Sequence, residues 1–340
     1  MRHSKAIRGV LAAAAVSTLT LAGCSSGEGA APAADSGNAD SGPLKIGIAI
    51  PTANQTYWTS WTNGAKDEAA KLGAEVTFID GRNDAQTLND QVNTLLVGGT
   101  KGIVIASVDP DANKVAVQAA SGAGIPTITA NRNVNMPYGG VDGADPKVHV
   151  GFNDVQIGEL QAKLVVQACE GIDPCNVVEE VGTLGSTPQR DRTKGLANGI
   201  QSSPNIKIIE QRDNDFDPGK AIDVTQAVLQ KHKDINVITT QEDPSAVAVV
   251  KVLKEQNRQN GIKVVGIGGS IDGVKAIEAG DLYGSVKVSA HVDGATAVQA
   301  IVDVVKKQPL KTEMLAGRPT VIVPAIEVTK DNAADNPGDW

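Results

Sequence analysis

From residue 44 onward, the chain alternates short runs rich in Val and Ile with longer amphipathic segments, almost to residue 329. Near-continuous apolar runs are typical of strands buried on both faces, and the amphipathic segments have the periodicity of helices. This alternation predicts an α/β fold with doubly wound parallel sheets. We expect strands at 44–50, 75–80, 102–106, 126–129, 148–151, 176–181, 206–211, 236–240, 263–268, 283–288 and 321–326, and helices that include 59–72, 84–97, 153–169, 218–231 and 245–256.

The length of this region favours two lobes over a single sheet, because about 290 residues are more than one open sheet usually needs. A passage rich in Gly, Pro and Asn at 133–146 separates a first block of strand–helix units from a second. Ligands of such sheets bind at the carboxyl ends of the strands. We therefore expect a cleft between two similar lobes.

The first 24 residues have the features of a secretory signal. Arg2, Lys5 and Arg8 precede an apolar run at 10–21, and Leu-Ala-Gly-Cys24 follows it. The run is too short to span a bilayer as a mature helix, and the ending resembles the lipobox of bacterial lipoproteins. We expect a signal peptide at 1–23, a lipidated Cys24 and a flexible tether at 24–43, which is made almost wholly of small and polar residues. The protein would then be extracytoplasmic and anchored to the membrane; a cleaved signal beside an unmodified Cys24 is the alternative.

The charge and the cysteine content narrow the class of protein further. The formal net charge is −8, with 39 acidic against 31 basic residues, and no basic cluster suggests a nucleic-acid partner. Cys169 and Cys175 flank a turn-forming segment with Gly and Pro, and in an oxidising compartment they are expected to pair. A zinc site is the alternative, but no His lies nearby.

The aromatic residues are few and unevenly placed. The chain has three each of Phe, Tyr and Trp, yet Tyr57, Trp58 and Trp61 follow the first predicted strand together. Rings at a strand-to-helix loop favour a flat apolar surface for a ligand. Packing of the first helix on its sheet is the alternative, and the position of Trp61 suits it.

Several segments, in this order and spacing, resemble the ribose-binding group of type I periplasmic binding proteins. They are 48–58, 109–111, 125–132, 185–192, 215–217, 240–243 and 264–270. The resemblance implies two lobes joined by three hinge strands, with lobe 1 at 44–152 plus 289–314, lobe 2 at 153–288 plus 315–329, and a C-terminal tail at 330–340. It also implies a monomeric, non-enzymatic protein that captures a sugar-like solute by hinge closure and delivers it to the permease of an ABC importer. A sensor lipoprotein that presents a bound signal molecule to a membrane receptor is the alternative.

The resemblance also assigns ligand-binding roles to residues at the ends of strands. Arginines supply fixed donors, amides can donate and accept, and rings stack on sugar faces. The predicted ligand-binding residues are Gln55, Tyr57, Trp58, Asn131, Arg132, Arg192, Phe216 and Gln241. For the two arginines, a surface salt bridge is the alternative.

The chain departs from the sugar-binding pattern at Gly268, where the group has Asp, at Val288, where it has Gln, and at Ala106, where it often has Asn. A lost carboxylate leaves a ligand hydroxyl without its strongest partner. Glu242, Asp243 or Ser270 could replace it. The solute could therefore be another sugar, a polyol or a ligand with its own carboxylate.

Signals for other chemistry are weak. Gly266-Ile-Gly-Gly269 lacks the full dinucleotide fingerprint, and no phosphate-binding Gly-Lys-Ser/Thr or nucleophile elbow occurs. The acidic repeat at 213–217 lacks the Gly and Glu of a calcium loop. We predict no catalytic residue, cofactor or metal.

Overall fold

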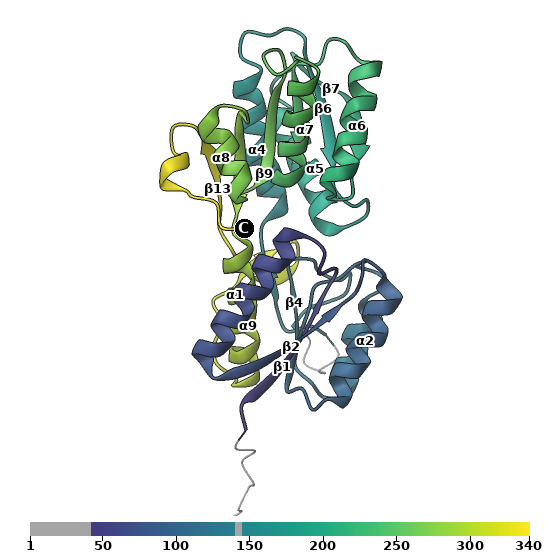
Figure 1. Ribbon diagram of the computed structural model, residues 1–340. Coiled ribbons are helices and arrows are strands. Elements are labelled where there is room, and N and C mark those ends of the chain that lie inside the picture. Colours follow the sequence, from purple (N-terminus) through teal and green to yellow (C-terminus); the bar gives the residue numbers. More distant parts are fainter. Residues whose placement is uncertain (1–41, 140–144) are drawn as a thin grey trace, which may run out of the picture. The chain divides into compact units, whose positions relative to one another are not determined.

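The computed structural model describes residues 42–139 and 145–340, and Pro43–Trp340 form one compact unit (Figure 1). The predicted signal peptide, Cys24 and nearly all of the tether lie outside the described residues. Over 42–139 and 145–340, no helix is both long enough and apolar enough for a membrane span.

The first sheet has seven strands in the order β11-β12-β5-β4-β3-β1-β2. They are parallel except for β11, which pairs antiparallel with β12. The strands are β1 (Leu44–Ile50), β2 (Ala74–Asp80), β3 (Gly102–Ile105), β4 (Thr127–Ala130), β5 (His149–Gly151), β11 (Glu313–Leu315) and β12 (Arg318–Ile322), and the helices of this lobe are α1 (Thr56–Leu72), α2 (Ala85–Val97), α3 (Lys114–Gly122) and α9 (Ala290–Val305).

The second sheet has six strands in the order β13-β10-β9-β8-β6-β7, with only β13 antiparallel. The strands are β6 (Cys175–Val181), β7 (Ile206–Asp213), β8 (Val237–Thr240), β9 (Lys263–Gly268), β10 (Gly284–Val288) and β13 (Ala325–Thr329). The helices are α4 (Asp154–Ala168), α5 (Thr187–Ile200), α6 (Pro218–Lys231), α7 (Asp243–Glu255) and α8 (Ile271–Ala279), followed by the short 3₁₀ helix η1 (Ala333–Asp335).

The chain passes between the two sheets three times: from β5 to α4, from β10 to α9, and from β12 to β13. This confirms the predicted α/β class with two parallel-sheet lobes joined by three connections. The third crossing comes later than residue 314, because Arg318–Ile322 pairs in parallel with β5 and belongs to the first sheet. The strand predicted at 321–326 is in fact the end of β12 and the start of β13, which belong to different sheets.

Helices in each lobe approach each other closely through glycines. A Cβ on Gly294 of α9 would lie 1.9 Å from the carbonyl oxygen of Trp61 on α1, and a Cβ on Gly195 of α5 would lie 2.0 Å from that of Val155 on α4. Real side chains do not tolerate such distances, so only glycine fits here. These contacts fix α9 against α1 and α5 against α4, which matters because each pair carries residues of the site described below.

The predicted disulfide is present. Cys169 follows α4 and Cys175 begins β6, and their sulfur atoms are bonded at 2.06 Å. The bridge closes a short loop at one end of the second lobe and therefore acts as a local link.

Candidate functional site

A small cavity lies at the carboxyl ends of strands from both sheets, with a volume of about 50 Å³. That volume is room for a few water molecules. All eight predicted ligand-binding residues line this cavity, although their contact with a ligand stays a prediction. The lining residues are Gln55, Tyr57, Trp58, Asn131, Arg132, Pro188, Arg192, Phe216, Gln241, Glu242, Ile267, Gly268, Val288 and Trp340.

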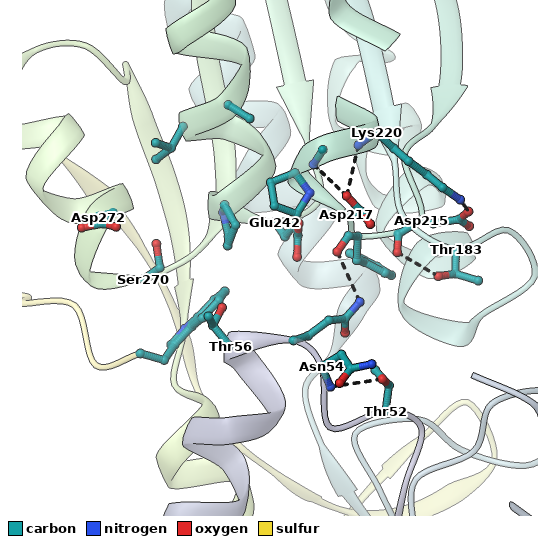
Figure 2. Close-up of a pocket in the computed structure, with 18 of the residues that line it drawn as sticks. Thr52, Asn54, Thr56, Thr183, Asp215, Asp217, Lys220, Glu242, Ser270 and Asp272 are labelled. Carbon is teal, nitrogen blue, oxygen red and sulfur yellow. Dashed lines mark hydrogen bonds and ion pairs between the residues drawn. The ribbon is translucent and has the colours of Figure 1, made fainter. Parts of the chain in front are cut away.

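A wider groove of about 1600 Å³ adjoins the cavity. Figure 2 shows Asp217 and Glu242 of the second lobe across this groove from Asn54 of the first. Four residues line both spaces and so separate them: Gln55, Phe216, Glu242 and Trp340. The Gln55 Nε2 donates to the carbonyl oxygen of Phe216 at 3.2 Å, which links the two lobes at this boundary.

Arg132, which follows β4, is the most unusual group of the site. Its side chain is buried, and its guanidinium carbon lies 6.0 Å from the ring centroid of Trp58 and 5.9 Å from that of Phe216. Its Nε has no hydrogen-bond partner, and no ion pair joins it to a carboxylate among the described residues. Burial, and then the charge of Arg192, lower its pKa to about 10, so it stays protonated at neutral pH. A buried cation with unused donors favours a ligand that supplies acceptor oxygens.

Arg192 is also buried, but the protein holds it in place. Its Nε donates to Asp154 Oδ1 at 2.8 Å, and its Nη1 donates to the carbonyl oxygen of Gln241 at 2.8 Å. The salt bridge considered from the sequence therefore exists for Arg192, although inside the site and not at the surface. The Gln241 amide is occupied too: its Nε2 donates to Thr193 Oγ1 at 3.0 Å, and its Oε1 accepts from the backbone N–H of Gly182 at 3.2 Å.

Tyr57 and Asn131 share a buried carboxylate that the sequence did not reveal. The Oδ2 of Asp293 accepts hydrogen bonds from Tyr57 OH at 3.0 Å, Trp61 Nε1 at 2.9 Å and Asn131 Nδ2 at 3.0 Å. Burial raises the pKa of Asp293 to about 7, against the opposing effect of these bonds. Asn131 has a φ of 56°, a left-handed conformation that Asn adopts more readily than most residues. Asp293 therefore positions the Tyr57 ring and the Asn131 amide, whose donor groups are already in use.

The ring of Phe216 is positioned by a glycine beneath it. A Cβ on Gly182 would lie 2.0 Å from the Phe216 Cζ, so the ring occupies space that any larger residue would fill. Phe216 has a φ of 55°. This backbone is sparsely populated for a bulky residue, and it places the ring beside Arg132.

The structure explains why Gly268 has no side chain. A Cβ there would lie 2.7 Å from the Cγ of Asp243. Asp243 is completely buried: its Oδ2 accepts from the backbone N–H of Gly269 at 2.6 Å, and its Oδ1 accepts from Ser285 Oγ at 2.6 Å. Asp243 thus holds the backbone after β9 and cannot replace the missing ligand acceptor.

The other two candidate acceptors behave differently. Ser270 caps α8, where its Oγ accepts from the backbone N–H of Gly273 at 2.9 Å, and it does not line the cavity. Glu242 does line it, and the Ser245 Oγ donates to its Oε1 at 2.7 Å. Burial raises the pKa of Glu242 to about 7. Of the three candidates, Glu242 is the one with a carboxyl group at the cavity.

Asp293 and Trp340 are among the site residues that the sequence did not reveal. Asp293 reaches the site through the packing of α9 on α1, and Trp340 through the return of the chain after η1. The segments that carry the family resemblance end at residue 270, before both residues, so no signal in the sequence marked them. Among the described residues, no group of three or more His, Cys, Asp or Glu side chains could hold a metal ion.

Comparison with known proteins agrees with this geometry. The family model described as a periplasmic binding protein domain matches residues 46–309. The chain belongs to the periplasmic binding protein family. Members of this family bind and transport substrates, which makes the cavity of this periplasmic binding protein the candidate binding site.

Its relatives include proteins named for sugars. It is 28% identical over 269 residues to the ribose import binding protein RbsB of Salmonella typhimurium, covering 79% of this chain and 87% of that one. It is 29% identical over 272 residues to the galactofuranose-binding protein YtfQ of Escherichia coli, covering 78% and 83%. A solved ABC transporter solute binding protein from Mycobacterium smegmatis with bound glycerol is 30% identical, with a TM-score of 0.78 over 86% of this chain and 96% of that one.

Proposed function

We propose that this protein is an extracytoplasmic, lipid-anchored subunit of an ABC importer that captures a monosaccharide or a related polyol between its two lobes. The single observation that carries the proposal is Arg132, a buried guanidinium between two rings with unused donors at an interlobe cavity. Rings suit the apolar face of a sugar, and the donors suit its oxygens. The pocket therefore offers both kinds of contact that a polyhydroxylated solute needs.

The relatives support an uncharged solute of this size. Their names give ribose and galactofuranose, and a similar solved structure holds glycerol. A ligand with a carboxylate would meet Arg132, but it would also lie beside Glu242, so a neutral solute is favoured.

Capture would involve a hinge motion about the three connections. Ligand contacts from both lobes stabilise the closed state in proportion to their differential affinity for it. Gln55 and Phe216, which hydrogen-bond across the boundary, would form part of the closing edge. Delivery to an importer is favoured over sensing because the relative RbsB is named an import binding protein.

The proposal of a lipid anchor is supported by the sequence alone. Arg2, Lys5 and Arg8, the apolar run at 10–21 and Cys24 together support cleavage before a lipidated cysteine, with residues up to 43 as the tether. Multiple acyl chains would hold the protein stably at the membrane. Mass spectrometry of the membrane-extracted protein would show an N-terminal acylated Cys24, and a Cys24→Ala variant would lose the modification.

A thermal-shift screen of pentoses, hexoses, polyols and sugar acids tests the function. A binder raises the melting temperature as its concentration increases. At a hundred times its Kd, it adds about 2.7 kcal/mol to the free energy of unfolding. We expect a neutral sugar or polyol to give this shift and to be recovered unchanged. A chemically altered product, or no shift with any compound, would refute the proposal.

A further inference from the structure

The last residues of the chain return to the site after η1 and are held there by the second lobe. The backbone N–H of Asp339 donates to the carbonyl oxygen of Gly269 at 3.1 Å, and that of Ile271 donates to the main-chain oxygen of Trp340 at 2.6 Å. The Lys287 Nζ donates to the Pro337 carbonyl oxygen at 2.6 Å. These bonds hold residues 337–340, here called the return segment, against β9, β10 and α8.

The first lobe holds the same segment. The Ser60 Oγ of α1 donates to the carbonyl oxygen of Asp339 at 3.2 Å, and the Ser289 Oγ donates to the Asp339 carboxylate. The rings of Tyr57 and Trp340 meet edge to face, with centroids 5.5 Å apart. The return segment is therefore bound to both lobes beside the cavity.

The indole of Trp340 lies at the point where the sugar-binding pattern is broken. Its Nε1 donates to the carbonyl oxygen of Gly268 at 3.3 Å, and both Gly268 and Trp340 line the cavity. Gly268 has no side chain, and Asp243 behind it is fully engaged by the protein. Trp340 also lines the outer groove, so its ring forms part of the wall between the two spaces.

We propose that Trp340 is a ligand-contacting residue that determines specificity, and that Asp339, Ser60 and Ser289 position it. The inference rests on the proposed function. With an indole bordering Gly268, the site selects solutes that present a C–H face there. Solutes that need a charged acceptor at this position are disfavoured. Trp340 also couples solute binding to the relative position of the two lobes, because the return segment is hydrogen-bonded to both lobes.

The test uses the compound that gives the largest thermal shift with the parent protein, with affinities measured by calorimetry. We expect Trp340→Ala to weaken binding at least about tenfold, as truncation of a central aromatic anchor does. Trp340→Phe keeps a ring and should retain most of the affinity. Asp335→Ala is the matched control, since Asp335 is exposed and belongs to η1 just before the return segment.

Fluorescence gives a second readout that does not depend on the size of the affinity change. The chain has three tryptophans; Trp58 and Trp61 are both buried, and Trp58 and Trp340 line the cavity. At saturating ligand, Trp340→Phe should lose a measurable part of the emission change that the parent shows.

The outcomes separate the two claims. If the parent binds and Trp340→Ala binds within twofold of it, or Trp340→Phe keeps the whole emission change, the role of Trp340 is refuted while the proposed function stands. If Trp340→Phe binds as weakly as Trp340→Ala although both melt like the parent without ligand, the ring contact is refuted. If the parent binds no compound in the screen, the proposed function fails and this inference fails with it.

Discussion

Replacing Arg132 by Met should separate stability from binding. In the ligand-free protein the change removes two ring contacts of the cation, at about 0.5–2 kcal/mol each. It also removes a buried Nε without a partner, whose burial costs about 1–3 kcal/mol. These effects oppose each other, and the Met side chain fills the space of the Arg132 side chain as far as its Nε. We therefore expect the free energy of unfolding to change by less than about 2 kcal/mol.

Binding should respond very differently to this substitution. Hydrogen bonds to a charged group contribute about 1.5–3 kcal/mol, so the loss of Arg132 should weaken the solute about 10- to 150-fold. Denaturant titration and calorimetry on the same preparations give the two quantities. Arg318→Met is the matched control, because Arg318 also has an unpartnered Nε and lies 6.0 Å from the ring centroid of Tyr138, but it does not line the cavity. An Arg132→Met protein that binds like the parent, or that loses more than about 3 kcal/mol of stability, would refute this reasoning.

Three further results are expected. The pKa of Asp293 is raised to about 7, so its contribution to stability is present below about pH 4 and is lost as the pH rises through 7. Over this interval, the free energy of unfolding of Asp293→Asn should therefore rise by up to about 4 kcal/mol relative to that of the parent, as measured by denaturant titration. A difference between the two proteins that does not depend on pH would contradict this prediction. Gly294→Ala places a Cβ 1.9 Å from the Trp61 carbonyl oxygen and should destabilise by about 1–3 kcal/mol or more, seen as a lower melting temperature; an unchanged melting point would show that α1 and α9 can separate at no cost. Reduction of the Cys169–Cys175 bridge should lower stability by about 2 kcal/mol without changing solute affinity, and a large affinity change would mean that the bridge does more than link a local loop.

Much of the fold could be predicted from the pattern of apolar residues, because buried parallel strands consist of nearly continuous runs of Val and Ile. The prediction was weakest at the chain's final strands. Residues 321–326 were predicted as one strand, yet Pro324 separates β12 from β13, and the two strands join different sheets. Strands of five residues at or near sheet edges are only partly buried, so their sequence carries little signal about the sheet that they join.

The candidate site could be predicted wherever residues follow a strand, since the carboxyl ends of parallel strands meet at one edge. Arg132 after β4 and Phe216 after β7 lie at such ends, and the family resemblance assigned them ligand-binding roles. Asp293 and Trp340 were not found, because the segments that carry the family resemblance end at residue 270. Tertiary packing brings Trp340 to the cavity and brings Asp293 to Tyr57 and Asn131, and nothing local in the sequence marks either residue.

Sequence also could not show which side chains are free to bind. Tyr57 and Asn131 donate to Asp293, and the Gln241 amide hydrogen-bonds within the second lobe. Arg132, in contrast, has a donor without a partner. Residue type indicates which hydrogen bonds a group can make, but only the packed structure shows which of them are already made.

A crystal structure of the protein with the best compound from the thermal-shift screen would test the central claim most directly. The account predicts an unaltered solute in the cavity between the lobes, with an oxygen within hydrogen-bond distance of the Arg132 guanidinium and a ring of Trp58, Phe216 or Trp340 against its apolar face. A solute bound elsewhere, or one in the cavity with no contact to Arg132, would contradict it.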